Sequence, residues 1–215
     1  MSKNETDFSK IEQRELSRAR YVAYTNRLKT WQFWRAMIVC FCAFSLIGHL
    51  CEWVYCYFGA VFFNSISMDA EVLTNPFKPF FVYGIGFIVC AVVLDPIKLF
   101  MIDKLGNKKK ALGVFYIMGV FLGMAGELIQ GFLQNQPVDG VYPLWDVSNY
   151  PGNILGQAWI VNDILLGALI TFIVWVVYPL VDTQIGKLED RVANIHCAVV
   201  AAAFLVLVVV TYFII

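Results

Sequence analysis

The chain has 215 residues and a formal net charge of zero, with 60% hydrophobic and only 15% charged residues and a mean hydropathy of +0.68. Ordinary soluble domains are about 45–50% apolar and about 25% charged, so the composition excludes that class. The apolar residues form continuous runs that are long enough to cross a bilayer, rather than the alternating strands of a membrane β-barrel. The sequence therefore predicts an all-α polytopic membrane helix bundle whose partner is lipid rather than nucleic acid.

The N-terminal residues 1–33 form a separate basic segment. Apolar residues recur in it at helical spacing, and Thr6 could cap the start of a helix. We predict a cytoplasmic amphipathic helix with two open interpretations: it lies on the anionic inner leaflet, or it docks a cytoplasmic partner. The apolar positions of this helix are Phe8, Ile11, Leu16, Ala19 and Val22.

Residues 34–215 are predicted to form the membrane bundle. Continuous apolar runs of about 20 residues or more each predict one transmembrane helix. The run beginning at Cys197 stays apolar to the end of the given sequence. The sequence predicts five spans, at about 34–58, 80–101, 111–133, 154–180 and 197–215.

The distribution of Lys and Arg predicts the orientation. Summed alternately over the segments between spans, fifteen of the sixteen basic residues fall on one side, and Lys78 alone falls on the other. The positive-inside rule places the basic side in the cytoplasm. We therefore expect the N-terminus inside and the C-terminus outside, in a bacterial cytoplasmic membrane.

Three acidic residues lie inside predicted spans, where a buried charge costs several kcal/mol. At 1.5 Å of helix rise per residue, Glu52, Glu127 and Asp163 all lie roughly 9–14 Å below the outer surface. His49 lies one turn further inward than Glu52. We expect a buried acidic site that binds a cation or an amine-bearing solute, or relays protons. Since burial and like charge both favour the protonated form, at least one acid should stay protonated unless a cation offsets the charge.

Small residues on the same helix faces favour this site. In the third predicted span, glycines flank Glu127 at a spacing of four residues. Small residues at this spacing mark the sides of transmembrane helices that pack closely, so the acids should face the bundle interior. The shared faces are Ser45, Gly48, Glu52 and Cys56 in the first span, Gly119, Gly123, Glu127 and Gly131 in the third, and Gly156, Trp159, Asp163, Gly167 and Thr171 in the fourth.

Residues 143–156, "PLWDVSNYPGNILG", are polar, turn-rich and free of Lys and Arg. Asp146 and Ser148 can form a local side-chain turn, and Asn153 is a good cap for a fourth span that begins at 154. Trp145 suits a membrane interface. Two interpretations stay open: a structured turn anchored by aromatic residues, or a partly re-entrant lid over the acidic site.

Motifs for enzymatic chemistry are missing from the sequence. It contains no G-x-x-x-x-G-K-[ST] loop, so the chain cannot supply its own ATPase, and no H-E-x-x-H or G-x-S-x-G motif. The pair His49 and Glu52 is a weak metal signal. The six cysteines fit helix packing, and Cys51 and Cys56 are badly placed for a disulfide. We predict a protein that is not an enzyme and has neither a cofactor nor a resident metal.

Several motifs resemble a known family. They are Gly48-x-x-x-Glu52, Tyr83-Gly84-Ile85-Gly86, Glu127 in the third span, and the string Trp145-Asp146-x-Ser148-x-x-Pro151-x-Asn153-x-x-Gly156. Over residues 40–175 the chain resembles the "Putative ABC-transporter type IV" family of small bacterial membrane proteins. The resemblance implies a transporter permease component and adds Tyr83 and the Trp145 string to the candidate site residues.

Three functions therefore stay open from the sequence. The first is a permease component with a buried acidic site, which at five spans would need a homodimer or separate ATPase and membrane subunits. The second is a structural or regulatory membrane protein in which protonated acids tie helices together. The third is an intramembrane enzyme that uses Glu52 and Glu127 as acid and base.

Overall fold

The structure is a computed structural model that describes residue 19 and residues 21–63, 68, 70–138, 140, 142 and 144–214. Within these residues, five helices are long and apolar enough to cross a membrane, which confirms the predicted number of spans and the all-α class. The orientation of the spans stays a prediction. The five spans are Trp31–Phe62, Phe81–Leu105, Lys108–Gln134, Ile160–Ile185 and Asp190–Phe213.

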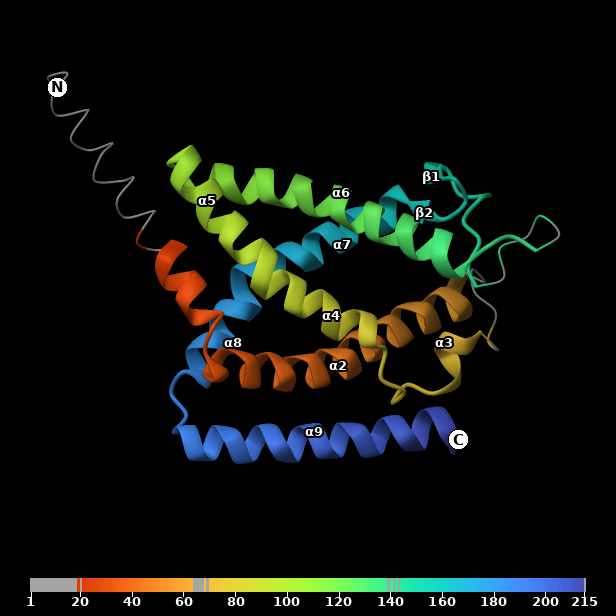
Figure 1. The fold of residues 1–215 in the computed structure, drawn as a ribbon. Coiled ribbons are helices and arrows are strands. Elements are labelled where there is room, and N and C mark those ends of the chain that lie inside the picture. Colours follow the sequence, from red (N-terminus) through yellow and green to blue (C-terminus); the bar gives the residue numbers. More distant parts are fainter. Residues whose placement is uncertain are drawn as a thin grey trace, which may run out of the picture. The chain divides into compact units, whose positions relative to one another are not determined.

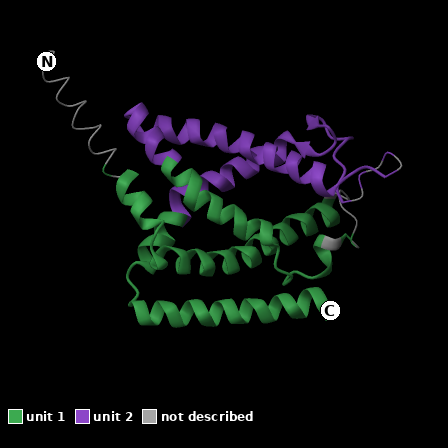
Figure 2. Cartoon of the chain, viewed as in Figure 1, with its two compact units in different colours: residues 1–96, 178–215 green, residues 97–177 purple. Residues whose placement is uncertain are grey.

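The chain divides into two compact units, which Figure 2 colours separately. Unit 1 comprises residues 1–96 and 178–215, and unit 2 comprises residues 97–177. In unit 1, α2 packs against both α4 and α9, as Figure 1 shows. The elements of unit 1 are α2 (Trp31–Phe63), α3 (Glu71–Thr74), α4 (Phe81–Val89), the π-helical turn η1 (Cys90–Leu94), the start of α5 (Asp95–Leu105), α8 (Tyr178–Ile185) and α9 (Asp190–Phe213).

Unit 2 is built on the packing of α6 against α7 (Figure 1). The side chain of Asn107 starts α6 because its oxygen accepts from the backbone N–H groups of Lys109 and Lys110, at 2.9 and 3.1 Å. The elements of unit 2 are the rest of α5, α6 (Lys108–Gln134), the strands β1 (Asn153–Ile154) and β2 (Ala158–Trp159), α7 (Ile160–Phe172) and the π-helical turn η2 (Ile173–Val177).

Glycines bring α6 and α7 close together, as their spacing predicts. A Cβ added at Gly119 would lie 3.2 Å from the carbonyl oxygen of Gly167, and one at Gly123 would lie 3.0 Å from Cβ of Leu166. Gly119, Gly123 and Gly167 are all buried. The structure therefore confirms that the glycine stripe of the third span is a helix-packing face.

Large apolar side chains cover the outside of the spans. Phe121 on α6 is 61% exposed and Phe213 on α9 is 80% exposed. A soluble protein rarely exposes so much contiguous apolar surface. These side chains suit a lipid environment, in agreement with the predicted membrane bundle.

The predicted start of the fourth span is wrong. α7 begins at Ile160 rather than 154, and its N-cap is Trp159, which makes no side-chain capping bond. Asn153 is therefore not the cap of this helix. It lies in a two-stranded antiparallel hairpin, where it is paired with Trp159. Positive φ values at Leu155 and Gly156 turn the chain between the two strands, a geometry that a helix from 154 onward would not allow.

The amphipathic N-terminal helix is only partly within the described residues. Residues 21–27 are helical, and α2 follows after a turn at 28–30. The proposed cap Thr6 and the apolar positions Phe8, Ile11 and Leu16 lie outside the described residues. The extent of this helix and its role stay predictions.

Two spans contain a π-helical turn, which the sequence analysis did not predict. Such turns free carbonyl groups from the helical ladder, and these need other donors. In unit 1 the Tyr24 hydroxyl donates to the carbonyl of Val92 in η1 at 2.6 Å. In unit 2 the Lys98 ammonium donates to the carbonyl of Val174 in η2 at 3.0 Å. Each π-helical turn is therefore stabilised by a side chain from a distant part of the chain.

Candidate functional site

Unit 2 brings two of the predicted acids together. Glu127 lies near the end of α6, and Asp163 lies in the first turn of α7. Their carboxyl groups lie within hydrogen-bonding reach of each other. Glu127 also accepts hydrogen bonds from the side-chain amide of Asn162 and from the backbone N–H of Trp159. The pair therefore lies where α6 meets the N-terminus of α7.

The Asp163 carboxyl group is the most unusual part of this arrangement. The residue is 0% exposed, and neither of its oxygens has a hydrogen-bond donor among the described residues. Two carboxyl groups can share a hydrogen bond only if one carries a proton, because an ionised carboxylate only accepts. A buried unpaired carboxylate is costly, and the expectation that the pair holds a proton or a cation stays a prediction.

The loop that precedes α7 is held by a buried pair of amides. Asn135 is 0% exposed and Gln157 is 3% exposed. The Asn135 amide donates to the Gln157 side-chain oxygen at 3.0 Å, and the Gln157 amide donates to the Asn135 carbonyl at 2.9 Å. Trp145 joins this network, since its indole N–H donates to the Gln157 carbonyl at 2.8 Å and its own carbonyl accepts from Asn135 at 2.7 Å.

The polar residues of this loop form the local turn that the sequence predicts. The backbone N–H of Ser148 donates to Oδ1 of Asp146 at 2.9 Å. Hydrogen bonds from the side chain and then the backbone of Ser148 lower the pKa of the exposed Asp146 carboxyl below its ordinary value. The Asn153 amide donates to the carbonyls of Ser148 and Tyr150, each at 2.9 Å. Asn153 therefore closes the turn from within.

Gly156 is required at the end of this loop. Its φ of +68° lies in the left-handed region, and an added Cβ would collide with the Ser148 hydroxyl and lie 2.7 Å from the Tyr142 ring. Hydrogen bonds within the string from Trp145 to Gly156 hold it as one local structure. Whether it covers the acidic site as a lid stays a prediction.

Unit 1 places Glu52, His49 and Tyr83 together on α2 and α4. The Tyr83 hydroxyl hydrogen-bonds with the Glu52 carboxyl, whose Oε2 is buried without a partner. His49 is 0% exposed and stacks on Phe80 with ring centroids 3.8 Å apart. Its Nε2 lies 3.3 Å from the carbonyl oxygen of Val72 in α3, and its Nδ1 has no hydrogen-bond partner within the described part of the chain.

The three predicted acids therefore fall in different units. Glu127 and Asp163 meet in unit 2, whereas Glu52 belongs to unit 1. The single cavity that the sequence analysis expects for all three acids stays a prediction. Among the described residues, no group of three or more His, Cys, Asp or Glu side chains is placed to hold a metal ion.

Three residues of the site were missed from the sequence. Asn162 is a polar residue in an apolar run, directly before Asp163, and this position could have drawn attention to it. Asn135 and Gln157 lie 22 positions apart, and each looks like an ordinary loop amide in the sequence. No local pattern shows that these two amides pair in the interior.

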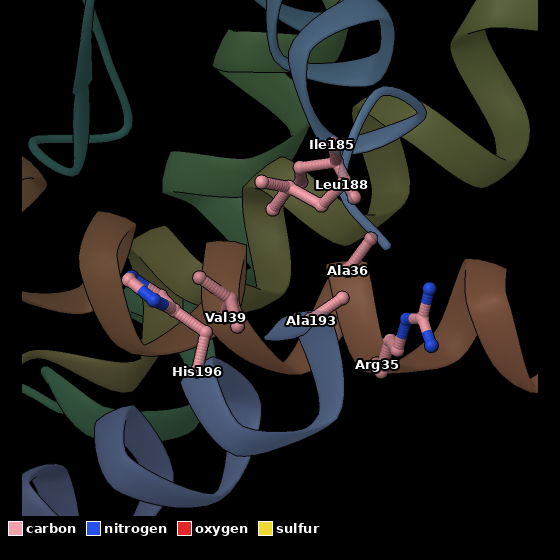
Figure 3. A pocket seen from close by; sticks show the side chains of 7 residues that line it. All are labelled: Arg35, Ala36, Val39, Ile185, Leu188, Ala193 and His196. Carbon is pink, nitrogen blue, oxygen red and sulfur yellow. The ribbon is translucent and has the colours of Figure 1, made fainter. Parts of the chain in front are cut away.

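A cavity of about 190 Å³ lies in unit 1. Figure 3 shows its lining by small and branched apolar side chains, with Arg35 and His196 at different edges. The Arg35 guanidinium is already paired, with Nη2 at 2.6 Å from Oδ1 of Asp190 and Nη1 at 3.0 Å from Oδ1 of Asn194. None of the predicted site residues lines this cavity.

The five apolar helices and the buried polar groups define a multi-pass membrane protein. Comparison with family models then identifies the family. The chain belongs to the "Putative ABC-transporter type IV" family, whose model matches residues 39–212. The protein is therefore a membrane transporter-related protein, which confirms the resemblance seen in the sequence. The comparisons with curated proteins and with solved structures gave no match.

Proposed function

We propose that this chain is the membrane-spanning component of an ABC-type transporter and that Glu127 and Asp163 bind a small cation or an amine group of its solute. The observation that carries the proposal is the Asp163 carboxyl group, which is fully buried and has no donor on either oxygen among the residues that the structure describes. Ionisable residues within membrane spans are costly and typically mark ion or substrate sites.

The chemistry of the pair favours a cation over an anion. Asp163 and Glu127 offer carboxyl oxygens, and Asn162 is a neutral amide that already donates to Glu127. Carboxylate oxygens only accept hydrogen bonds, so they suit a metal cation of low charge or an ammonium group. When no cation is bound, one proton shared by the pair removes the repulsion between the two carboxylates.

The proposed transporter needs partners. The chain has no phosphate-binding loop, so a separate ATPase subunit would supply nucleotide hydrolysis. A homodimer or a second membrane subunit would complete the solute pathway. We place the complex in a bacterial cytoplasmic membrane, with the N-terminus of the chain inside.

A structural role is the second candidate. Glu127 accepts from the backbone N–H of Trp159 and from Asn162 at the start of α7, as a group that caps a helix N-terminus would. In that case the carboxyl pair would only tie α6 to α7. The two candidates differ in whether a soluble cation stabilises the protein.

The test is cation-dependent melting of the purified protein in mild detergent. Sodium, potassium, methylammonium or putrescine replaces choline at constant ionic strength, for wild type, Glu127→Gln and Asp163→Asn. The exposed Glu189→Gln serves as a matched acid-to-amide control. A ligand at 100 times its Kd stabilises the folded state by about 2.7 kcal/mol, so the melting temperature should rise by several degrees.

We expect at least one of these cations to raise the melting temperature of wild type and Glu189→Gln but not of either site variant. Equal behaviour of wild type and Asp163→Asn with every cation would contradict the proposal and favour the structural role. Affinity purification from the same detergent tests the partner. An ATPase subunit should be recovered with the chain, and recovery of the chain alone would contradict a separate ATPase.

A further inference from the structure

The first two and the next two spans share a sequence pattern. Gly48-x-x-x-Glu52 in the first span matches Gly123-x-x-x-Glu127 in the third. The second and fourth spans each contain a buried glycine, Gly84 and Gly167, twelve residues before a proline. The two pairs of spans therefore contain the same motif, the same buried glycine and the same proline in the same order.

The π-helical turns lie at matching positions within this pattern. η1 and η2 are both five residues long, and each is followed by one residue and then a proline, Pro96 or Pro179. The boundaries between the two compact units fall within two residues of these prolines, after Pro96 and before Tyr178. π-helical turns are rare, so two at equivalent positions are strong evidence of a repeated unit.

The helix contacts match as well. In unit 1 a Cβ on Gly48 would collide with Tyr83, and in unit 2 a Cβ on Gly123 would press on Leu166. Tyr83 and Leu166 each lie one residue before the buried glycine of their helix. The same packing face is thus used in both units.

The remaining pair of contacts follows the same rule. A Cβ on Gly84 would collide with the hydroxyl of Ser45, and a Cβ on Gly167 would lie 2.5 Å from Cγ2 of Val120. Ser45 and Val120 each precede the glycine of their G-x-x-x-E motif by three positions. Agreement between sequence spacing and contacts is expected of a duplicated two-span unit, an arrangement that recurs in membrane transporters.

We infer that the chain contains a tandem repeat of one two-span unit and that Glu52, like Glu127 with Asp163, is the acid of a proton-binding site, so that each repeat holds one proton. The inference goes beyond the proposed function and relies on it only for the site in unit 2.

The surroundings of Glu52 support a second site. Ser45, His49 and Glu52 lie on one face of α2, at positions i, i+4 and i+7. Ser45 and His49 are both 0% exposed, and each has one side-chain polar atom with no partner among the described residues, as does Glu52. Such a line of unsatisfied buried groups needs a proton, a water or an ion to satisfy it.

The described hydrogen-bond partner of Glu52 is a neutral group rather than a cation. Tyr83 contributes a neutral hydroxyl, just as Asn162 contributes a neutral amide to Glu127. Phe80, which stacks on His49, takes the place that Asp163 has in unit 2. Among the described residues, Phe80 thus replaces the second carboxyl group, so Glu52 would carry its proton alone.

Dicyclohexylcarbodiimide provides the test, because it reacts with protonated carboxyl groups in apolar surroundings. The carboxyl O–H adds across a C=N bond of the reagent, the proton moves to nitrogen, and rearrangement gives a stable N-acylurea with no leaving group. The full-length protein in mild detergent is treated at neutral pH and digested, and each labelled residue is identified by peptide mass spectrometry.

We expect label at Glu52 and at the Glu127–Asp163 pair in wild type, and none at the exposed Glu189. Glu52 should still be labelled at the wild-type rate in the Glu127→Gln/Asp163→Asn variant, because each repeat holds its own proton. An unlabelled Glu52 beside a labelled pair would overturn the inference and leave the proposed function standing. A labelled Glu52, with no cation effect on melting, would instead support the inference and contradict the proposed function.

Discussion

The helix pairs α2–α4 and α6–α7 share equivalent glycine contacts but differ in the polar side chains that lie between the helices. In unit 1, α2 and α4 enclose one acid, Glu52, with an aromatic stack of His49 on Phe80 beside it. In unit 2, α6 and α7 enclose two acids, Glu127 and Asp163. The glycine contacts between the helices are equivalent, and one of the differences between the two sites is Phe80 in unit 1 where unit 2 has Asp163.

The comparison shows where function can diverge without loss of the fold. The glycine contacts between the helices are similar in the two units, whereas the polar groups beside each acid differ with the second helix of the pair. Unit 2 offers Asn162 and Asp163 from the first turn of α7, and unit 1 offers Tyr83 from α4. We therefore expect substrate chemistry in unit 2 and a simpler protonated acid in unit 1.

The largest expected effect comes from the shared glycines. Gly123→Leu places a side chain against Leu166, and Gly48→Leu places one against Tyr83. Overpacking of a close helix contact costs about 1–3 kcal/mol or more, so both variants should unfold early or fail to accumulate. Melting temperature in detergent and yield of monodisperse protein measure the effect.

Controls for these variants lie on the same helices. Gly126→Leu on α6 and Gly86→Leu on α4 have nothing within 4 Å of the added Cβ and should melt close to wild type. If Gly48→Leu were as stable as Gly86→Leu while Gly123→Leu unfolded, the result would contradict the equivalence of the glycine contacts in the two helix pairs.

The buried amide pair should give the next largest effect, and it has no counterpart among the described residues of unit 1. Asn135→Leu removes the side-chain amide that donates to Oε1 of Gln157 and the side-chain oxygen that accepts from the backbone N–H of Leu144. An unsatisfied buried polar group costs about 1–3 kcal/mol, so the melting temperature should fall by several degrees. The exposed Asn149→Leu is the matched control, and an equal loss in both variants would contradict the role of the pair.

Smaller effects are expected from the neutral donors to the acids. Tyr83→Phe removes the hydroxyl bonded to Glu52, and Asn162→Leu removes the amide bonded to Glu127. A hydrogen bond contributes about 0.5–1.5 kcal/mol, and removal of a donor near an acid should cost at least this much. Chemical denaturation in mixed detergent measures the loss. A clear loss in one variant and none in the other would sharpen the difference between the two units.

The smallest expected effect is the pH response of the Asp146 turn. Ser148 lowers the pKa of the Asp146 carboxyl below its ordinary value of 3.8, so the turn is stabilised above that pH and loses this contribution as the pH falls through the lowered pKa. Ser148→Ala should raise this pKa toward 3.8 and move the loss to higher pH. Carboxyl titration by carbon NMR measures the shift, and an unchanged Asp146 titration would contradict the turn.

Much of the fold follows from the sequence, because length and apolarity alone define a span in lipid. The third span, predicted at 111–133, is α6 at Lys108–Gln134. The fourth span was misjudged because Asn153 has the chemistry of a helix cap, whereas the positive φ at Leu155 turns the chain into a hairpin first. Propensity identifies a cap only if the next residues continue the helix.

The role of the site residues stays a prediction. Asp163, Gly167 and Thr171 are buried on one face of α7, as the spacing predicts, whereas Glu127 on α6 is partly buried. The Asn135–Gln157 pair could not be predicted, because a hydrogen bond between amides far apart in the chain produces no periodic pattern in the sequence. The π-helical turns were also missed, since a single extra residue per turn is set by tertiary contacts such as that of Lys98 with Val174.

Infrared spectroscopy of the carboxyl C=O stretch tests the central claim most directly, namely that the buried Glu127–Asp163 pair carries a proton or a cation. The protein is measured at neutral pH with choline as the only cation, as wild type and as the Glu127→Gln/Asp163→Asn variant. We predict a band of a protonated carboxyl group in wild type that is weaker in the variant and that falls in wild type when the stabilising cation is added. Equal bands in wild type and the variant, unchanged by the cation, would contradict the account.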